Sequence, residues 1–242
     1  MNDEQVDVLF FGAHPDDVEL SAGGTVAKLV KEGKRVGMID LTRGEMGTRG
    51  TPAIRKREAA NAARILGASF RRQLDFGDGG VKTGREQELE IIEIVRRHRP
   101  RIVFVSYQDD RHPDHVRTGN VVSDASFYAG LRQLEVKGLA AHRPQAVIYY
   151  MQHYTPPATF IVDVTDVWKT KMRAVAAYKS QFFNPAAKGP RTKLSDKTFI
   201  EMIEARARHY GAQIGATYGE PFFTKQPPRI EDVIGAYEGR EV

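Results

Sequence analysis

Short apolar runs alternate along the chain with longer segments in which apolar residues recur at helical spacing. Val6–Gly12 (VDVLFFG) and Arg101–Ser106 (RIVFVS) are typical of buried parallel strands, because such strands are covered on both faces and apolar residues follow one another. This pattern predicts strands at Val6–Gly12, Arg35–Leu41, Phe70–Asp75, Arg101–Ser106, Ala146–Met151 and Thr159–Val164. Helices are predicted at Ala22–Lys31, Pro52–Leu66, Gly84–His98, Pro113–Tyr128, Asp166–Tyr178 and Ser195–Tyr210.

The alternation of strands and helices determines the expected fold. Crossover connections of this kind build a mainly parallel sheet with helices on both faces. We therefore expect a single α/β domain over residues 1–242, with a three-layer, Rossmann-like architecture. Ligands of such sheets bind beyond the carboxyl ends of the strands. The loops after Gly12, Leu41, Ser106 and Met151 are therefore the places where a functional site is expected.

Two clusters of imidazole and carboxylate side chains follow two of these strands, in the motifs GAHPDD and HPDH. A catalytic zinc site uses three nitrogen or oxygen ligands from the protein and keeps a fourth position open. His14, Asp17 and His115 would supply such a set. Asp16 is suited to accept a proton from water, and His112 would lie at the edge of the site. Either motif alone is more often a simple turn or helix cap, but two at the ends of two strands favour a metal site.

The composition narrows the kind of metal site. The chain has no cysteine, which excludes cysteine zinc sites, iron–sulfur clusters and cysteine nucleophiles. Imidazole and carboxylate ligands suit an open hydrolytic site better than a closed structural one. Zn²⁺ is the metal that this ligand set favours, with Fe²⁺, Mn²⁺ or Co²⁺ as alternatives.

The net charge of +5 comes from 36 Lys and Arg against 31 Asp and Glu. Acidic residues are interspersed with the basic ones, as in RKRE and REQELE, whereas nucleic-acid-binding proteins gather their charge. No apolar run reaches the roughly 18 residues of a membrane span, and the acidic start does not resemble a signal peptide. We therefore expect a cytoplasmic protein with an anionic small-molecule substrate, or merely a basic surface, and with no nucleic-acid or membrane partner.

Together, GAHPDD and HPDH resemble the LmbE-like, or PIG-L, zinc-dependent N-deacetylases. The glycine-rich segment 41–50 (LTRGEMGTRG) is similar to a loop of that family. The segments YYM, KSQF, EARAR and GEPF, at 149–151, 179–182, 204–208 and 219–222, resemble the branch that deacetylates N-acetylglucosaminyl-malate in bacillithiol biosynthesis.

The resemblance implies an LmbE-like fold, a bound Zn²⁺ and hydrolysis of an N-acetylated amino sugar, with acetate as a product. Since family members are often oligomers, it also implies a homo-oligomer. Matched by position, the metal ligands are His14, Asp17 and His115, the general base is Asp16, and His112 steadies the oxyanion or acts as an acid. Arg55 and Arg111 would hold the malate carboxylates, and Arg143 would be a further polar residue of the site. Glu45, in a loop after a strand, is a candidate for binding sugar hydroxyls.

Three other functions compete with this interpretation. A deacetylase of another N-acetylglucosamine conjugate, such as a chitooligosaccharide, would need no basic residues for malate. A nucleotide-binding module could use Gly23 and Gly24, but the chain lacks the GxGxxG and GxxxxGK[ST] motifs. A nucleic-acid-binding protein would show salt-sensitive DNA binding.

Overall fold

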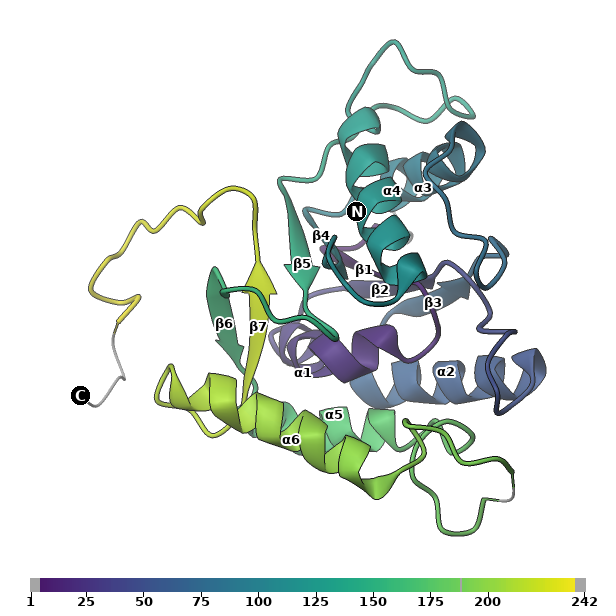
Figure 1. The fold of residues 1–242 in the computed structure, drawn as a ribbon. Helices are drawn as coiled ribbons and strands as arrows, with labels where there is room; N and C mark the ends of the chain where they lie inside the picture. Colours follow the sequence, from purple (N-terminus) through teal and green to yellow (C-terminus); the bar gives the residue numbers. More distant parts are fainter. Residues whose placement is uncertain (1–4, 188, 238–242) are drawn as a thin grey trace.

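Seven strands form one mixed sheet in the computed structural model, which describes residues 5–187 and 189–237 (Figure 1). The strands are β1 (Val8–Gly12), β2 (Val36–Asp40), β3 (Phe70–Gln73), β4 (Ile102–Ser106), β5 (Ala146–Tyr150), β6 (Phe160–Asp163) and β7 (Gly219–Phe223). Their order is β3-β2-β1-β4-β5-β7-β6, in which the first five are parallel and β7 is antiparallel to both β5 and β6. The predicted mainly parallel sheet is confirmed.

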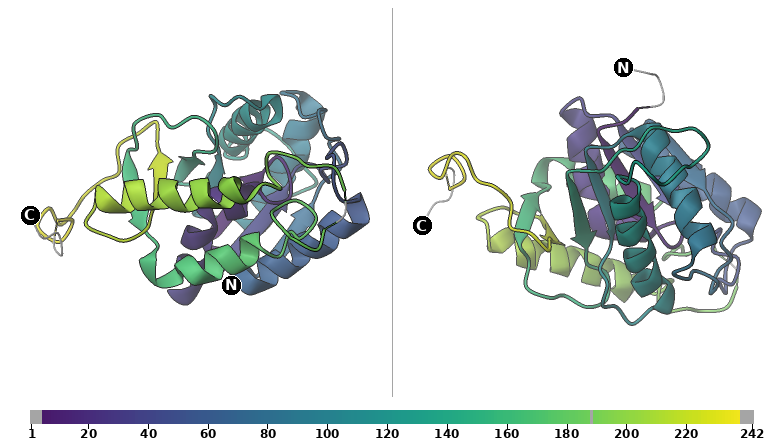
Figure 2. Two further views of the ribbon diagram at one scale, coloured as in Figure 1. Left: turned by 60° about the horizontal axis from the view of Figure 1, so that its bottom comes forward. Right: turned by 90° about the horizontal axis from the view of Figure 1, so that it is seen from above.

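Helices cover both faces of the sheet, as predicted (Figures 1 and 2). One face carries α1 (Asp17–Lys31), α2 (Pro52–Leu66), α5 (Trp168–Val175) and α6 (Lys197–Ala212), and the short helix η1 (Thr165–Val167) precedes α5. The other face carries α3 (Arg85–His98) and α4 (Pro113–Tyr128). Each face has its own buried apolar cluster, so the sheet separates two cores. Within the described residues, no helix is long and apolar enough to cross a membrane.

Helix α1 begins at Asp17, five positions before the predicted start at Ala22. Its first turn was not recognised because Asp17, Glu19 and Ser21 are polar and yet buried. Acidic residues in a first turn interact favourably with the helix dipole. Glu19 is also paired with Arg71 of β3, whose guanidinium bonds to Asp40 of β2 as well. Buried ion pairs thus replace the apolar periodicity that identifies the rest of the helix.

Strand β7 lies inside the sheet and was not predicted from the sequence. It contains Pro221, which has no N–H for a ladder and argues against an interior strand. The pairing with β5 covers only Phe222 and Phe223, so Pro221 lies beyond that ladder. The strand is tied to α1 by Glu220, which accepts hydrogen bonds from the backbone N–H groups of Gly24 and Thr25 at 2.8 and 2.7 Å.

A buried ion pair connects β7 to α5. Lys171 Nζ lies 2.6 Å from Glu220 Oε1, and the two residues are 2% and 1% exposed. The backbone of Gly24 packs so closely here that a Cβ would lie 2.8 Å from Val164 and 3.0 Å from Glu220 Oε1. The pair therefore stands at a crowded junction of α1, α5 and β7.

Replacement of Lys171 by Met is expected to lower the free energy of unfolding by about 3–5 kcal/mol, because the Glu220 carboxylate would stay buried without its cation. Adding Glu220→Gln is expected to recover part of this loss, since a neutral amide needs no counterion and its one oxygen still accepts one of the two N–H groups of α1. Urea unfolding of the single and double variants measures both effects. If the double variant were no more stable than Lys171→Met, the loss of stability could not be attributed to an unpaired Glu220 carboxylate.

Candidate metal centre

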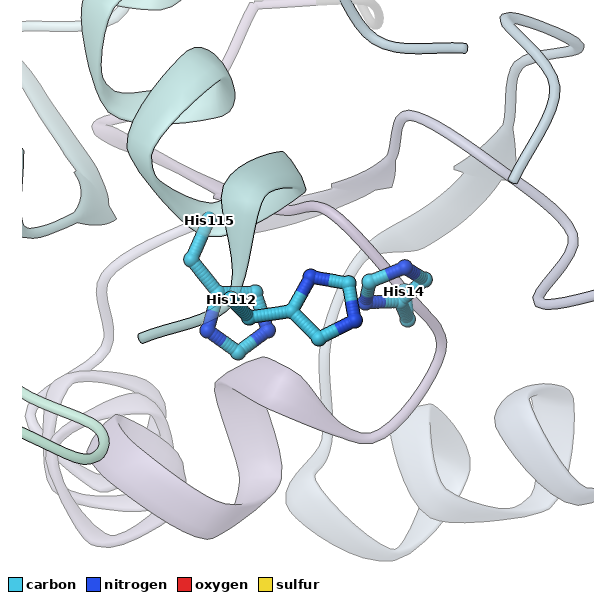
Figure 3. A group of neighbouring side chains, drawn as sticks. All are labelled: His14, His112 and His115. Carbon is cyan, nitrogen blue, oxygen red and sulfur yellow. The ribbon is translucent and has the colours of Figure 1, made fainter. Parts of the chain in front are cut away.

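The two histidine motifs meet at the carboxyl ends of β1 and β4, which are neighbouring strands. His14 lies in the loop between β1 and α1, and Asp17 is the first residue of α1. His112 caps α4 and His115 lies in its first turn. Figure 3 shows the three imidazoles gathered between the start of α4 and the loop before α1. One ring nitrogen of each lies within 4.8 Å of the others.

The carboxylate of Asp17 lies between His14 and His115. Its Oδ2 is 3.6 Å from His14 Nδ1, and its Oδ1 is 3.3 Å from His115 Nε2. The backbone N–H of His14 donates to Asp17 Oδ2 at 2.8 Å. The structure thus brings together the three residues expected to bind metal, with one oxygen of Asp17 toward each imidazole.

The far nitrogen of each of these two imidazoles faces a carboxylate. His14 Nε2 lies 3.1 Å from Asp78 Oδ1 and 3.5 Å from Asp114 Oδ2, and His115 Nδ1 lies 3.0 Å from Asp110 Oδ1. Histidines that bind metals almost always donate their second N–H to such a partner, which fixes the tautomer and makes the other nitrogen a better ligand. The donor set therefore fits a divalent metal ion.

The charges around the two imidazoles also favour a cation. Burial alone would lower the pKa of His14, but Asp114, Asp17 and Asp78 raise it well above its usual value. Burial likewise lowers the pKa of His115, but the charge of Asp17 and the bond to Asp110 raise it to about 9. These carboxylates therefore stabilise positive charge at the centre, and a divalent ion would take the place of the imidazole protons.

Asp78 and Asp110 were missed by sequence reasoning. Asp110 accepts hydrogen bonds from the backbone N–H of His112 and of His153, and it contacts two imidazoles. Burial raises the pKa of Asp110, but these hydrogen bonds bring it well below its usual range. Asp78 follows β3 in a glycine-rich turn (FGDGG) and Asp110 stands two positions before the HPDH motif. The only available signal was their position after strands β3 and β4.

Asp16 caps α1 in a strained backbone conformation, with φ of 114°. Left-handed backbone is uncommon for residues other than glycine and costs about 1–3 kcal/mol, and such strain clusters at functional sites. The side chain is buried and its Oδ2 accepts a hydrogen bond of 3.1 Å from Arg55 Nη2. Burial raises the pKa of Asp16 to about 7, although the charge of Arg55 opposes the shift. Asp16 can therefore gain and lose a proton near neutral pH.

The structure places Arg55 differently from the expectation that it holds a malate carboxylate. Arg55 is 5% exposed, and its guanidinium donates to Pro15 O at 2.5 Å and to Gly44 O at 3.0 Å, besides Asp16. Gly44 has a φ of 63°, and a Cβ there would lie 2.0 Å from Arg55 Nη1. Arg55 is therefore packed into the wall of the site, where it positions the carboxylate of Asp16.

His112 lines the cavity, and one of its ring nitrogens has no hydrogen-bond partner among residues 5–187 and 189–237. Its Nδ1 accepts a hydrogen bond of 3.2 Å from the backbone N–H of Asp114, which assigns the remaining hydrogen to Nε2. Burial and the positive charge of His115 lower the pKa of His112, so the neutral imidazole is favoured. A neutral Nε2–H is a suitable donor to an oxygen that gains negative charge.

The metal centre opens into a cavity of about 430 Å³. Arg111 lies at its edge and is exposed. Its other walls come from the loop after β2, the segment after β5, the loop before α6 and α6 itself. They include Met46, Arg49, Gln152, His153, Lys193, Leu194, Phe199, Met202, Ile203 and Arg206.

Two of the expected substrate-binding residues have other contacts. Glu45 accepts hydrogen bonds from the backbone N–H groups of Arg43 and Asp78, at 3.1 and 3.0 Å, and so it orders the loop behind His14. Arg143 lies outside the cavity, with its guanidinium 4.2 Å from the centre of the Phe127 ring. The long connection between α4 and β5 carries Arg143 away from the site.

The sequence matches known deacetylases. A profile of the PIG-L family, described as GlcNAc-PI de-N-acetylase, matches residues 9–126. Diacetylchitobiose deacetylase of Thermococcus kodakarensis is 36% identical over an alignment of 189 positions, which covers 72% of this chain and 70% of that protein. A 4-oxalmesaconate hydratase of Pseudomonas putida is 26% identical over 75% of this chain and 76% of its own length.

Solved structures agree with this similarity. A conserved protein of Thermus thermophilus superposes with a TM-score of 0.86 and 37% identity, over 95% of this chain and 99% of its own. The N,N'-diacetylchitobiose deacetylase of Pyrococcus horikoshii gives a TM-score of 0.80 and 29% identity, over 91% and 83% of the two chains.

Proposed function

This chain belongs to the PIG-L family of de-N-acetylases, and on that premise we propose that it is a metal-dependent N-deacetylase of an N-acetylglucosamine conjugate. The observation that carries the proposal is the placement of a buried acid, Asp16, beside the ligand set of His14, Asp17 and His115. Amide hydrolysis needs a polarised carbonyl and a base at the same point, and the site offers both.

The reaction adds water to the acetamide carbon and breaks its bond to nitrogen. A divalent ion on the three ligands would polarise the carbonyl and lower the pKa of a coordinated water toward about 7. Asp16, held by Arg55, accepts the proton of the attacking water. His112 donates its Nε2–H to the carbonyl oxygen as that oxygen becomes negative. The proton taken by Asp16 is then available to the departing nitrogen, and the products are acetate and the free amino sugar.

The basic side chains on the cavity favour an anionic group next to the sugar. Arg49, Arg111 and Lys193 line the cavity, and within residues 5–187 and 189–237 none of them forms an ion pair with a carboxylate. We therefore favour N-acetylglucosaminyl-malate, whose two carboxylates would meet these cations. Acetate release from this compound by the zinc-loaded protein tests the assignment.

A charge reversal at Arg111 is expected to raise KM for N-acetylglucosaminyl-malate far more than KM for N-acetylglucosamine, because only the first compound presents carboxylates to the guanidinium. Steady-state acetate release with both substrates measures the difference. The matched control is Arg57→Glu, on the exposed part of α2 and outside the cavity, which is expected to change neither KM. Equal changes with both substrates for Arg111→Glu would count against a malate substrate.

Diacetylchitobiose is the second candidate substrate, favoured by the 36% identity to an enzyme named for it. In this case the apolar wall of α6 would pack against the second sugar, and Arg111→Glu would have little effect. A hydratase would consume an unsaturated acid and release no acetate from either sugar. Parallel assays with the malate conjugate and with diacetylchitobiose therefore separate the three activities.

A further inference from the structure

Gln152, in the segment after β5, contacts the carboxylate ligand directly. Its side-chain Nε2 donates a hydrogen bond of 2.8 Å to Asp17 Oδ1 and lies 3.5 Å from His115 Nε2. The other oxygen of Asp17 accepts the backbone N–H of His14 at 2.8 Å. Both oxygens of the ligand therefore have a donor, and the carboxylate plane is fixed from two sides.

The orientation of the Gln152 amide follows from this contact. Within the described part of the chain, Gln152 Oε1 is buried and has no hydrogen-bond partner. A buried acceptor without a partner costs about 1–3 kcal/mol. Rotating the amide would place Oε1 against the Asp17 carboxylate, where two acceptors repel each other. The hydrogen bond from Nε2 to Asp17 thus fixes the orientation of the amide, although Oε1 is left without a partner.

Arg206 of α6 holds the backbone of Gln152. Its Nη1 donates to Gln152 O at 2.5 Å and its Nη2 donates to Leu20 O, in the first turn of α1, at 3.2 Å. Among residues 5–187 and 189–237, no carboxylate forms an ion pair with Arg206, and burial lowers the pKa of its guanidinium. The positively charged guanidinium of Arg206 therefore binds two backbone carbonyls, one in the segment of Gln152 and one in the first turn of α1, which begins at Asp17.

We propose that Gln152 is a positioning residue of the metal centre and that Arg206 acts through it. This proposal rests on the metal site of the proposed function. The N–H donor of Gln152 keeps Asp17 Oδ1 turned toward His115. Arg206 holds the backbone of Gln152 in the position from which the side-chain amide reaches Asp17. Loss of such a partner behind a metal ligand costs about 10–100-fold in metal affinity or activity.

The test is the affinity for Zn²⁺ alone, measured by competition with a chromophoric chelator. Gln152→Met, which is similar in length but has no N–H donor, is expected to weaken Zn²⁺ binding about 10–100-fold. Arg206→Met is expected to weaken it by a smaller factor in the wild-type chain and to have no further effect in the Gln152→Met chain. The matched control is Arg208→Met on the same helix, whose exposed guanidinium pairs with Glu204 and which should leave the affinity unchanged.

Unchanged Zn²⁺ affinity of Gln152→Met would overturn the proposal. So would a loss of affinity that only follows the fraction of unfolded protein, measured by near-UV circular dichroism, because the role would then be structural. If the effects of Arg206→Met and Gln152→Met on Zn²⁺ affinity were additive, Arg206 would not act through Gln152, and that part of the proposal would be wrong. A wild-type chain that binds Zn²⁺ but releases no acetate would contradict the proposed function and leave this proposal standing.

Discussion

Asp16→Asn is expected to lower kcat for acetate release by about 10²–10⁴-fold, because the variant has no base to take the proton of the attacking water. Asparagine has the size of aspartate and tolerates left-handed backbone, so the strained turn before α1 should persist. Arg55 would still donate to the amide oxygen. Zn²⁺ binding is expected to be retained, since Asp16 is not among the proposed ligands. Stopped assays of acetate, together with metal analysis of the same preparation, measure both quantities.

The control for Asp16→Asn is Asp124→Asn, the same substitution at an exposed position of α4. It removes one negative charge from the molecule without touching the cavity, and turnover should remain at the wild-type level. Near-wild-type turnover of Asp16→Asn with Zn²⁺ bound would exclude Asp16 as the base and would point to His112 or His153.

Removal of the metal is expected to abolish acetate release, because the remaining side chains offer no group that polarises the acetamide carbonyl as strongly as a divalent ion. Dialysis against a chelator, followed by addition of Zn²⁺, Fe²⁺, Mn²⁺ or Co²⁺ in turn, measures the loss and identifies the metals that restore turnover. Zn²⁺ is expected to restore it, since two imidazoles and one carboxylate form an open site of the kind that zinc uses in hydrolases.

Two histidine variants connect this result to the proposed ligands. His115→Ala is expected to bind no metal tightly, whereas His209→Ala, at an exposed histidine of α6, should bind it like the wild type. Full acetate release by thoroughly chelated protein would contradict a metal-dependent mechanism. Tight metal binding by His115→Ala would place the ion elsewhere.

The elements with strong apolar patterns were predictable from the sequence, and those with buried polar residues were not. β1 and β4 are continuous apolar runs and were found at nearly their observed bounds. The first turn of α1 was missed because Glu19 is buried through its pairing with Arg71, which local sequence does not reveal. β7 was missed because Pro221 argues against an interior strand and because Glu220 is paired with Lys171, which is far away in the sequence.

In the candidate site, too, some residues could be predicted from the sequence and others could not. His14, Asp17 and His115 could be selected because they follow strands that the sheet places side by side. Asp110 and Gln152 act by touching those residues, and their partners become apparent only when the loops are assembled. Arg55 was chosen for its charge, but its role follows from the direction in which α2 presents it, toward Asp16 and the loop at Gly44.

The pairing of β1 with β4 also has a consequence for the order of folding. His14 and His115 are roughly one hundred positions apart in the sequence, and α1, β2, α2, β3, α3 and β4 lie between them. Bringing them together closes a long loop, whose entropy must be offset by strand pairing before the ligands can converge. The ion should therefore be captured late, by a chain that already has its central sheet. Bound metal would then lower the rate of unfolding more than it would raise the rate of folding.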